Sequence, residues 1–150
     1  MRILIQRVNE ASVEIENQIK SKIMVGLMVL VGIEETDTIE DSEWLAGKVT
    51  ELRIFDDEKG IMNRSVKDIN GEILVVSQFT LHAMTRKGNR PSYIKAAKHE
   101  IAIPLYNHFC SELTYKLGKE VQTGTFAADM KVALVNNGPV TIWIDSKNKE

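Results

Sequence analysis

The chain of 150 residues is long enough for one domain with an ordinary hydrophobic core. Its 19 Lys and Arg against 21 Asp and Glu exclude a globally basic nucleic-acid binder but allow a local basic patch. A single cysteine excludes an intramolecular disulfide, and the longest apolar run, residues 23–33, is too short and too broken by glycine to cross a bilayer. We expect one cytoplasmic domain over residues 1–150, with no signal peptide and no membrane contact.

The first third of the chain is predicted to hold three strands and a helix. Residues 2–8 and 11–16 are predicted as strands, the second because apolar and polar side chains alternate along it. Residues 23–33 form a continuous apolar run, which is typical of a strand buried on both faces. Residues 36–52 begin with helix-capping residues and carry apolar residues at helical spacing, so they are predicted as a helix.

The middle of the chain is predicted to run from a strand through a loop into helices. Residues 72–81 follow an Asn-Gly turn and are predicted as a strand, whereas residues 82–92 have no apolar period and are predicted as a loop. Two helical patterns follow, from Ser92 to about Glu100 and from Pro104 to Leu117. Proline suits the first position of the second helix, and the glycine that follows suits its end.

The last third of the chain is predicted to consist of strands. Short strands are expected around Val121 and over residues 131–135, followed by a hairpin over residues 135–145. Asn137-Gly138 between two apolar runs is a strong hairpin signal, yet Pro139 stands where the returning strand should begin and cannot donate to a sheet. Gly138-Pro139 therefore either ends a strand or presents its backbone to something else. Because strands dominate and helices come late, the order favours an α+β fold.

The histidines and the cysteine do not indicate a metal site. His82, His99 and His108 have no ligand spacing among themselves, and His108 and Cys110 are two residues apart on a predicted helix, so they point in different directions. Cys110 lies on the apolar face of that helix, which favours a core position over a nucleophile. We expect no metal ion and no other cofactor.

Polar residues follow the predicted core strand at its C-terminal end. Ser77, Gln78 and Thr80 stand where sites are often built, although a strand that runs out into solvent has the same pattern. A serine or threonine hydrolase needs a base, and only His82 is close in sequence. The absence of a G-x-S-x-G motif weakens that interpretation.

A basic stretch follows this strand end. Its basic residues are Arg86, Lys87, Arg90, Lys95, Lys98 and His99. A solvated charged loop is the ordinary explanation, but a position between a polar strand end and a helix start also suits phosphate binding.

Four motifs are spread along almost the whole length of the chain. They are "RILIQRVNEASV" at 2–13, "SQFTL" at 77–81, "KGNRPS" at 87–92 and "TGTFAADMKVALVNNGPVT" at 123–141. In this order they resemble the D-aminoacyl-tRNA deacylases of the bacterial and eukaryotic type, of which S-Q-F-T and N-x-G-P-[V/F]-T are signatures. The joint occurrence of both signatures at this separation is highly specific.

This resemblance implies an enzyme that hydrolyses the ester joining a D-amino acid, or glycine, to the terminal adenosine of tRNA. It implies mostly antiparallel, barrel-like layered sheets with flanking helices, and a homodimer. In the family a cis Gly-Pro peptide enters the neighbouring subunit's pocket and rejects L-amino acids. By position, that peptide is Gly138-Pro139.

The resemblance also implies roles for the polar strand end. Ser77 and Gln78 are expected to hydrogen-bond the substrate, Phe79 to form a wall of its pocket, and Thr80 to lie nearest the reacting carbon. Backbone N–H groups of residues 78–80 are expected to stabilise the oxyanion, while the ribose 2′-hydroxyl assists the attacking water. Thr80 as a covalent nucleophile is the alternative.

Contacts with the rest of the tRNA are expected from two further places. Phe126 and Met130 are candidates for the terminal adenine, with core packing as the alternative, and Lys87 and Arg90 are candidates for phosphate. Two other functions compete with the deacylase: a non-catalytic RNA-binding dimer module, and a small esterase that uses Ser77 with His82.

Overall fold

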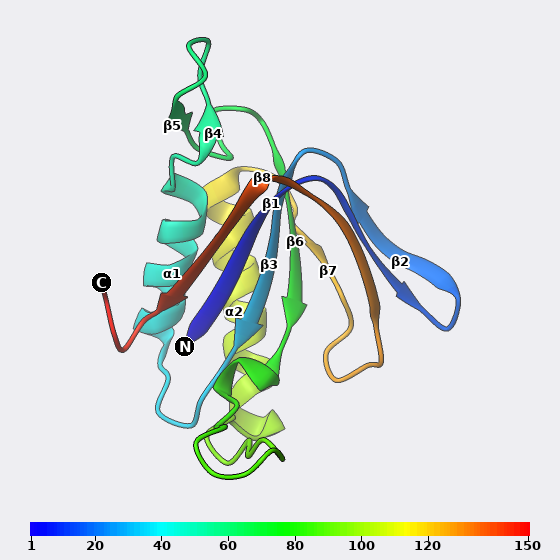
Figure 1. Ribbon diagram of the computed structural model, residues 1–150, viewed down its shortest axis with the longest axis vertical. Helices are drawn as coiled ribbons and strands as arrows, with labels where there is room; N and C mark the ends of the chain where they lie inside the picture. Colours follow the sequence, from blue (N-terminus) through cyan, green and yellow to red (C-terminus); the bar gives the residue numbers. More distant parts are fainter.

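One curved, mixed sheet with two helices on one face organises the molecule (Figure 1). The computed structural model describes all of residues 1–150. The elements in chain order are β1 (Arg2–Ile15), β2 (Gln18–Ile23), β3 (Gly26–Gly32), α1 (Ile39–Glu51), β4 (Phe55–Asp56), β5 (Met62–Arg64), β6 (Glu72–Ser77), the 3₁₀ helix η1 (Phe79–His82), α2 (His99–Leu117), β7 (Gln122–Thr123) and β8 (Lys131–Asp145). The predicted α+β class is confirmed, and neither helix has the length and apolar character needed to span a membrane.

The sheet is antiparallel around β1 and parallel beyond it. Its strand order is β2-β1-β3-β6-β7, and β8 pairs with β1 as well. β1 is antiparallel to β2, β3 and β8, whereas β6 is parallel to both β3 and β7. Figure 1 shows β1 and β8 bending together near their midpoints, which curls the sheet into a nearly closed, barrel-like layer. Residues 2–8 and 11–16, predicted as two strands, are therefore the two halves of the single strand β1.

The two central strands, β3 and β6, are buried on both faces. The apolar run at 23–33 predicts this for β3, but the strand covers only Gly26–Gly32, because Ile23 ends β2 and the exposed Met24 and Val25 lie between the two strands. Leu27, Val29 and Val31 of β3 pack in the cluster that includes both helices. Met28 packs in a second cluster on the face of the sheet away from the helices, and Leu30 packs against this cluster. Each such aliphatic side chain stabilises the fold by roughly 1.5–3 kcal/mol. The C-terminal ends of β3 and β6 are thus held rigidly side by side.

Two further differences from the prediction arise because long-range pairing decides where the elements begin and end. β6 ends at Ser77 rather than 81, since β3 ends as well and the chain turns into η1. The predicted helix at 92–100 is wrong: Ala96 forms a bridge with Glu34, and the Ala97 N–H donates to the Ile33 carbonyl at 2.9 Å. α2 consequently begins at His99 and contains Pro104 within it, while Gly118 ends it as predicted.

The hairpin predicted at 135–145 does not form. β8 continues as one strand and pairs with β1 on both sides of the Asn-Gly pair. Gln6 pairs with Thr141 and Val8 pairs with Asn136, so two residues along β1 correspond to five residues along β8. The additional residues of β8 form a large bulge. Pro139 lies in this bulge, where no ladder hydrogen bond is required of it.

Candidate active site

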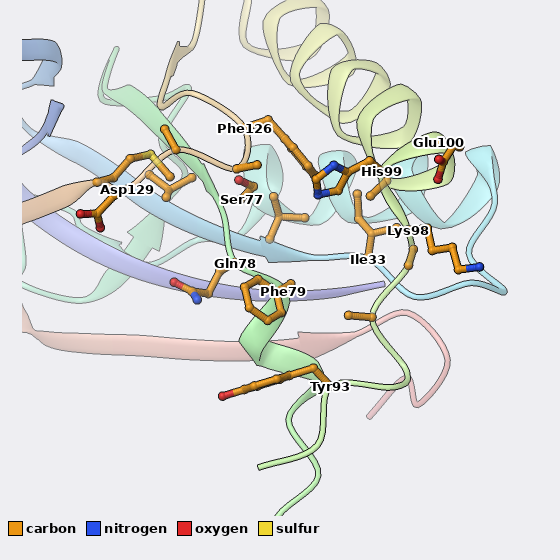
Figure 2. A pocket seen from close by; sticks show the side chains of 18 of the residues that line it. Ile33, Ser77, Gln78, Phe79, Tyr93, Lys98, His99, Glu100, Phe126 and Asp129 are labelled. Atoms are coloured by element: carbon orange, nitrogen blue, oxygen red, sulfur yellow. The ribbon is translucent and has the colours of Figure 1, made fainter. Parts of the chain in front are cut away.

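A cavity of about 770 Å³ opens where β3 and β6 end (Figure 2). Its lining comes from four places: the ends of these strands, the start of η1, the first turn of α2 with the segment before it, and the loop before β8. Five of the sequence-predicted site residues line it: Ser77, Gln78, Phe79, Phe126 and Met130. Thr80, Lys87, Arg90, Gly138 and Pro139 are not part of this lining.

Aromatic side chains form two sides of the cavity. The ring of Phe79 meets Tyr93 edge to face at 5.0 Å between centroids, and Phe126 meets His99 in the same way at 5.6 Å. Figure 2 shows these two pairs on either side of Ser77. Phe79 is 56% exposed, so an apolar face is left uncovered for a planar or apolar ligand group. Tyr93 was not predicted as a site residue, and His99 was predicted only as part of the basic stretch, although an aromatic residue within such a stretch is a usable signal.

The polar end of β6 is organised by Gln78. Its side-chain Nε2 donates to Thr80 Oγ1 at 2.5 Å, and its backbone N–H donates to the Val31 carbonyl at 2.7 Å. The Gln78 N–H is therefore already used, which corrects the expectation that it stabilises an oxyanion. The N–H groups of Phe79 and Thr80 lie in the first turn of η1, where a helix offers no internal acceptor.

His82 does not form the catalytic pair that an esterase with Ser77 requires. Its side chain is fully buried, neither ring nitrogen has a hydrogen-bond partner, and its Nδ1 lies 3.9 Å from Glu34 Oε2. Burial lowers the pKa of His82 below its ordinary value, which favours the neutral ring. A Cβ at Gly32 would lie 3.0 Å from the His82 ring and 2.9 Å from the Gln78 carbonyl, so glycine allows η1 to pack closely here.

Positive charge lies at the edge of the cavity. Lys87 and Arg90 are exposed on a loop that a bridge between Met84 and Ser92 closes. Lys98 lines the cavity and precedes α2 without a side-chain cap, so the first N–H groups of that helix are not capped by a side chain. Cationic side chains and a helix N-terminus both favour an anionic group at this edge.

Gly138-Pro139 is exposed on the β8 bulge and contains a cis peptide bond. Arg7, a buried residue of β1, holds this segment in place: its Nε donates to the Asn137 carbonyl at 3.1 Å. Its Nη1 donates to the Ile54 carbonyl at 2.6 Å, which fixes the guanidinium itself. Gly138 has a φ of +128°, and a Cβ there would lie 2.8 Å from Val140 Cγ2. Arg7 could not be predicted as a supporting residue from the sequence, because nothing local marks it.

The glycine-proline bulge and the cavity lie at opposite ends of the central strands. Arg7, beside the bulge, pairs with Leu27 near the start of β3, whereas Ser77 pairs with Val31 near its end. Four residues of strand separate these positions, or about 13 Å at 3.3 Å per residue. Within one chain, the bulge does not reach the cavity.

A family model and full-length relatives of this chain agree on one protein family. The family described as D-Tyr-tRNA(Tyr) deacylase matches residues 4–145. The D-aminoacyl-tRNA deacylases of Parabacteroides distasonis and Phocaeicola vulgatus are 68% and 66% identical over 150 residues, which cover all of this chain and all of each relative.

Two solved structures share the fold. The c-Myc DNA Unwinding Element Binding Protein is 39% identical with a TM-score of 0.92, covering 97% of this chain and 98% of that one. A probable eukaryotic D-amino acid tRNA deacylase is 17% identical with a TM-score of 0.82, covering 95% of this chain and 97% of that one. At 17% identity the second likeness concerns the fold alone.

Proposed function

Because the chain belongs to the D-Tyr-tRNA(Tyr) deacylase family and is a D-aminoacyl-tRNA deacylase, we propose that its cavity beside η1 binds the 3′-terminal aminoacyl-adenosine of the substrate. The observation that carries this proposal is the lining of the cavity by Ser77, Gln78 and Phe79 at a rigid strand end. Phe79 and Phe126 supply apolar faces for the adenine and the aminoacyl group, and Ser77 and Gln78 supply hydrogen bonds. We also propose that residues 1–150 form a single domain.

The reaction needs positioning more than a protein nucleophile. Water adds to the ester carbonyl, the bond from the carbonyl carbon to the ribose oxygen breaks, and that oxygen takes up a proton. The N–H groups of Phe79 and Thr80 hold the developing oxyanion, and the vicinal 2′-hydroxyl of the ribose assists the water. Thr80 Oγ1 has Gln78 as its partner and no base beside it, which argues against a covalent role.

Rejection of L-amino acids is proposed to rest on main-chain atoms of Gly138-Pro139. To keep errors near one in ten thousand, the enzyme needs roughly 5.5 kcal/mol of discrimination at 1.36 kcal/mol per decade. A side-chain pocket separates near-isosteres by only about 1–3 kcal/mol, and it would have to fit every D-amino acid. Rigid main-chain atoms placed beside the Cα of the substrate's amino acid exclude the L configuration whatever the side chain is, and they admit glycine.

These main-chain atoms must come from a second copy of the chain, so we propose a homodimer. Support comes from an apolar strip on the face of the sheet away from the helices: Trp143 of β8 pairs with Leu4 of β1, and Leu4 pairs with Leu30 of β3. Leu30 pairs in turn with Val76, which lines the cavity. A partner on this strip brings its own β8 near the cavity, with Gly138 five residues from Trp143 along that strand. Lys87 and Arg90 then contact phosphates of the acceptor end.

Side-by-side incubation with D-Tyr-tRNA and L-Tyr-tRNA, following ester loss, tests this function. We expect the D-ester to be cleaved at least a thousandfold faster than the L-ester, with Gly-tRNA cleaved as well. Tight RNA binding without any ester loss would instead favour the non-catalytic RNA-binding module. Equal cleavage of both esters would remove the chirality filter while leaving the hydrolase.

The proposed mechanism is tested separately by Thr80→Ala and by a modified RNA. Thr80→Ala is expected to retain measurable turnover, and the wild type to show no burst of acyl-enzyme, because Thr80 forms no covalent bond. A substrate that ends in 2′-deoxyadenosine is expected to be cleaved at least tenfold more slowly. Complete inactivity of a folded Thr80→Ala protein, together with a burst in the wild type, contradicts this mechanism.

A further inference from the structure

We propose that Glu43, His108 and Glu112 form a binding site for one divalent transition-metal ion, such as Zn²⁺, that bridges α1 and α2. None of these residues lines the cavity beside η1, so the site is separate from the deacylase chemistry. One ligand atom from each side chain lies within 4.8 Å of the other two. An imidazole with two carboxylates is a donor set that suits zinc and its neighbours in the first transition row.

The fold brings the three ligands together from two helices. His108 and Glu112 are four residues apart on α2, which places them on one face of that helix. Glu43 comes from α1, and its Oε1 lies 3.9 Å from His108 Nε2. In a tetrahedral zinc site, ligand atoms about 2.1 Å from the metal are about 3.4 Å apart, so small side-chain rotations close the observed gaps.

The buried Ser42 orients the imidazole for this role. Its Oγ lies 3.1 Å from His108 Nδ1. In the tautomer that carries the proton on Nδ1, the ring donates to Ser42 and directs the Nε2 lone pair toward Glu43. Metal-ligating histidines commonly have such a partner on their second nitrogen, because it fixes both the tautomer and the ring plane.

The charges and exposure of the cluster also suit a cation. The only cation paired with the cluster is Lys116, whose Nζ lies 3.5 Å from Glu112 Oε2, which leaves the other carboxylate oxygen for the metal. The side chains of Glu43, His108 and Glu112 are 51%, 30% and 25% exposed. A metal ion therefore has access from solvent, and water completes its coordination. Once bound, it ties α1 to α2 and stabilises the folded chain.

Titration of the chelator-treated protein with Zn²⁺, followed by calorimetry and by thermal unfolding, tests the site. We expect one ion per chain, and a rise of the unfolding midpoint by roughly 5–10 °C at a free Zn²⁺ concentration one hundred times the Kd. Glu43→Gln and His108→Ala are each expected to weaken binding at least tenfold and to abolish most of this rise. Mg²⁺ at the same concentration is expected to cause no rise, because it binds imidazole poorly.

Two matched variants separate this site from adventitious binding. Glu40→Gln removes a carboxylate from the same helix, and His99→Ala removes another accessible histidine; both are expected to bind Zn²⁺ as the wild type does. Circular dichroism without metal checks that Glu43→Gln is folded. The proposal is overturned if no saturable binding occurs, or if Glu43→Gln and His108→Ala bind Zn²⁺ as tightly as the controls.

Discussion

Gly138 is the position where a single methyl group tests the proposed chirality filter. Its φ of +128° is unfavourable for any L side chain, and an added Cβ would crowd Val140 and the Arg7 guanidinium. We predict that Gly138→Ala lowers kcat/KM for D-Tyr-tRNA at least tenfold, while the unfolding midpoint falls by only a few degrees. Gly60→Ala is the control, because Gly60 also has positive φ but has open space around its Cβ. Unchanged kinetics in Gly138→Ala would argue against a role for this backbone.

His82 makes stability depend on pH in a predictable direction. Burial lowers its pKa below the ordinary 6.5, Arg2 adds to this, and the Gly32 backbone and Glu34 oppose it. The unfolded chain therefore takes up a proton at His82 before the folded chain does. Stability is full above about pH 6.5 and is lost as the pH falls from there toward the lowered pKa.

The corresponding prediction compares unfolding midpoints of the wild type and His82→Phe between pH 7.5 and pH 5. The midpoint of the wild type is expected to fall more over this range, because only the wild type has a buried imidazole to protonate. His99→Gln serves as the control and is expected to follow the wild type. Parallel curves for the wild type and His82→Phe would contradict the assignment of a neutral, buried ring.

Among the secondary-structure elements, the bulge of β8 is held in place by hydrogen bonds from Arg7 of β1. The guanidinium spans two carbonyls, those of Asn137 and Ile54, which one ammonium group cannot do with the same geometry. We predict that Arg7→Lys lowers the preference for D-Tyr-tRNA over L-Tyr-tRNA at least tenfold. Arg53→Lys, at an exposed arginine that bonds Asn63, is expected to leave the preference unchanged. An unchanged preference in Arg7→Lys would show that the bulge needs no such support.

Local sequence patterns predicted the elements well where local chemistry decides them. The buried strand β3 lies within the apolar run at 23–33, although it begins only at Gly26, and the helix end at Gly118 follows from glycine geometry. The hairpin at 135–145 failed because Asn137-Gly138 fits a bulge as well as a turn, and the choice depends on pairing with β1, more than 120 residues away in sequence. The helix expected at 92–100 failed for the same reason, since the bridge to Glu34 holds that segment.

In the whole molecule, each complete site is proposed to need two chains. Trp143 is 48% exposed, with the Arg2 guanidinium 5.7 Å from its ring centroid. We predict that Trp143→Glu shifts the protein toward monomers in analytical ultracentrifugation and lowers deacylation at least tenfold. Tyr115→Glu alters an aromatic residue that is 81% exposed on α2, and it is expected to change neither property. A fully active monomer would refute the requirement for a partner.

Motifs could reveal the site residues that are close in sequence, but not the assembly or the contacts that cross the fold. Ser77, Gln78 and Phe79 share one motif and line one cavity. Arg7 supports Gly138 from a different strand, and Glu43 reaches His108 from a different helix. These pairs are 131 and 65 positions apart in the chain, and only the folded structure brings them together.

Whether Gly138-Pro139 of one chain completes the cavity of another can be tested by mixing two variants that are each damaged in a different part of the site. Gln78→Ala combined with Phe79→Ala damages the cavity and leaves the bulge intact, and Gly138→Ala does the reverse. After random exchange of subunits at equal amounts, half of the dimers are mixed and each of these has one intact site, so about a quarter of wild-type activity is expected. If the mixture instead has no more activity than the two variants measured alone, the bulge does not act across subunits.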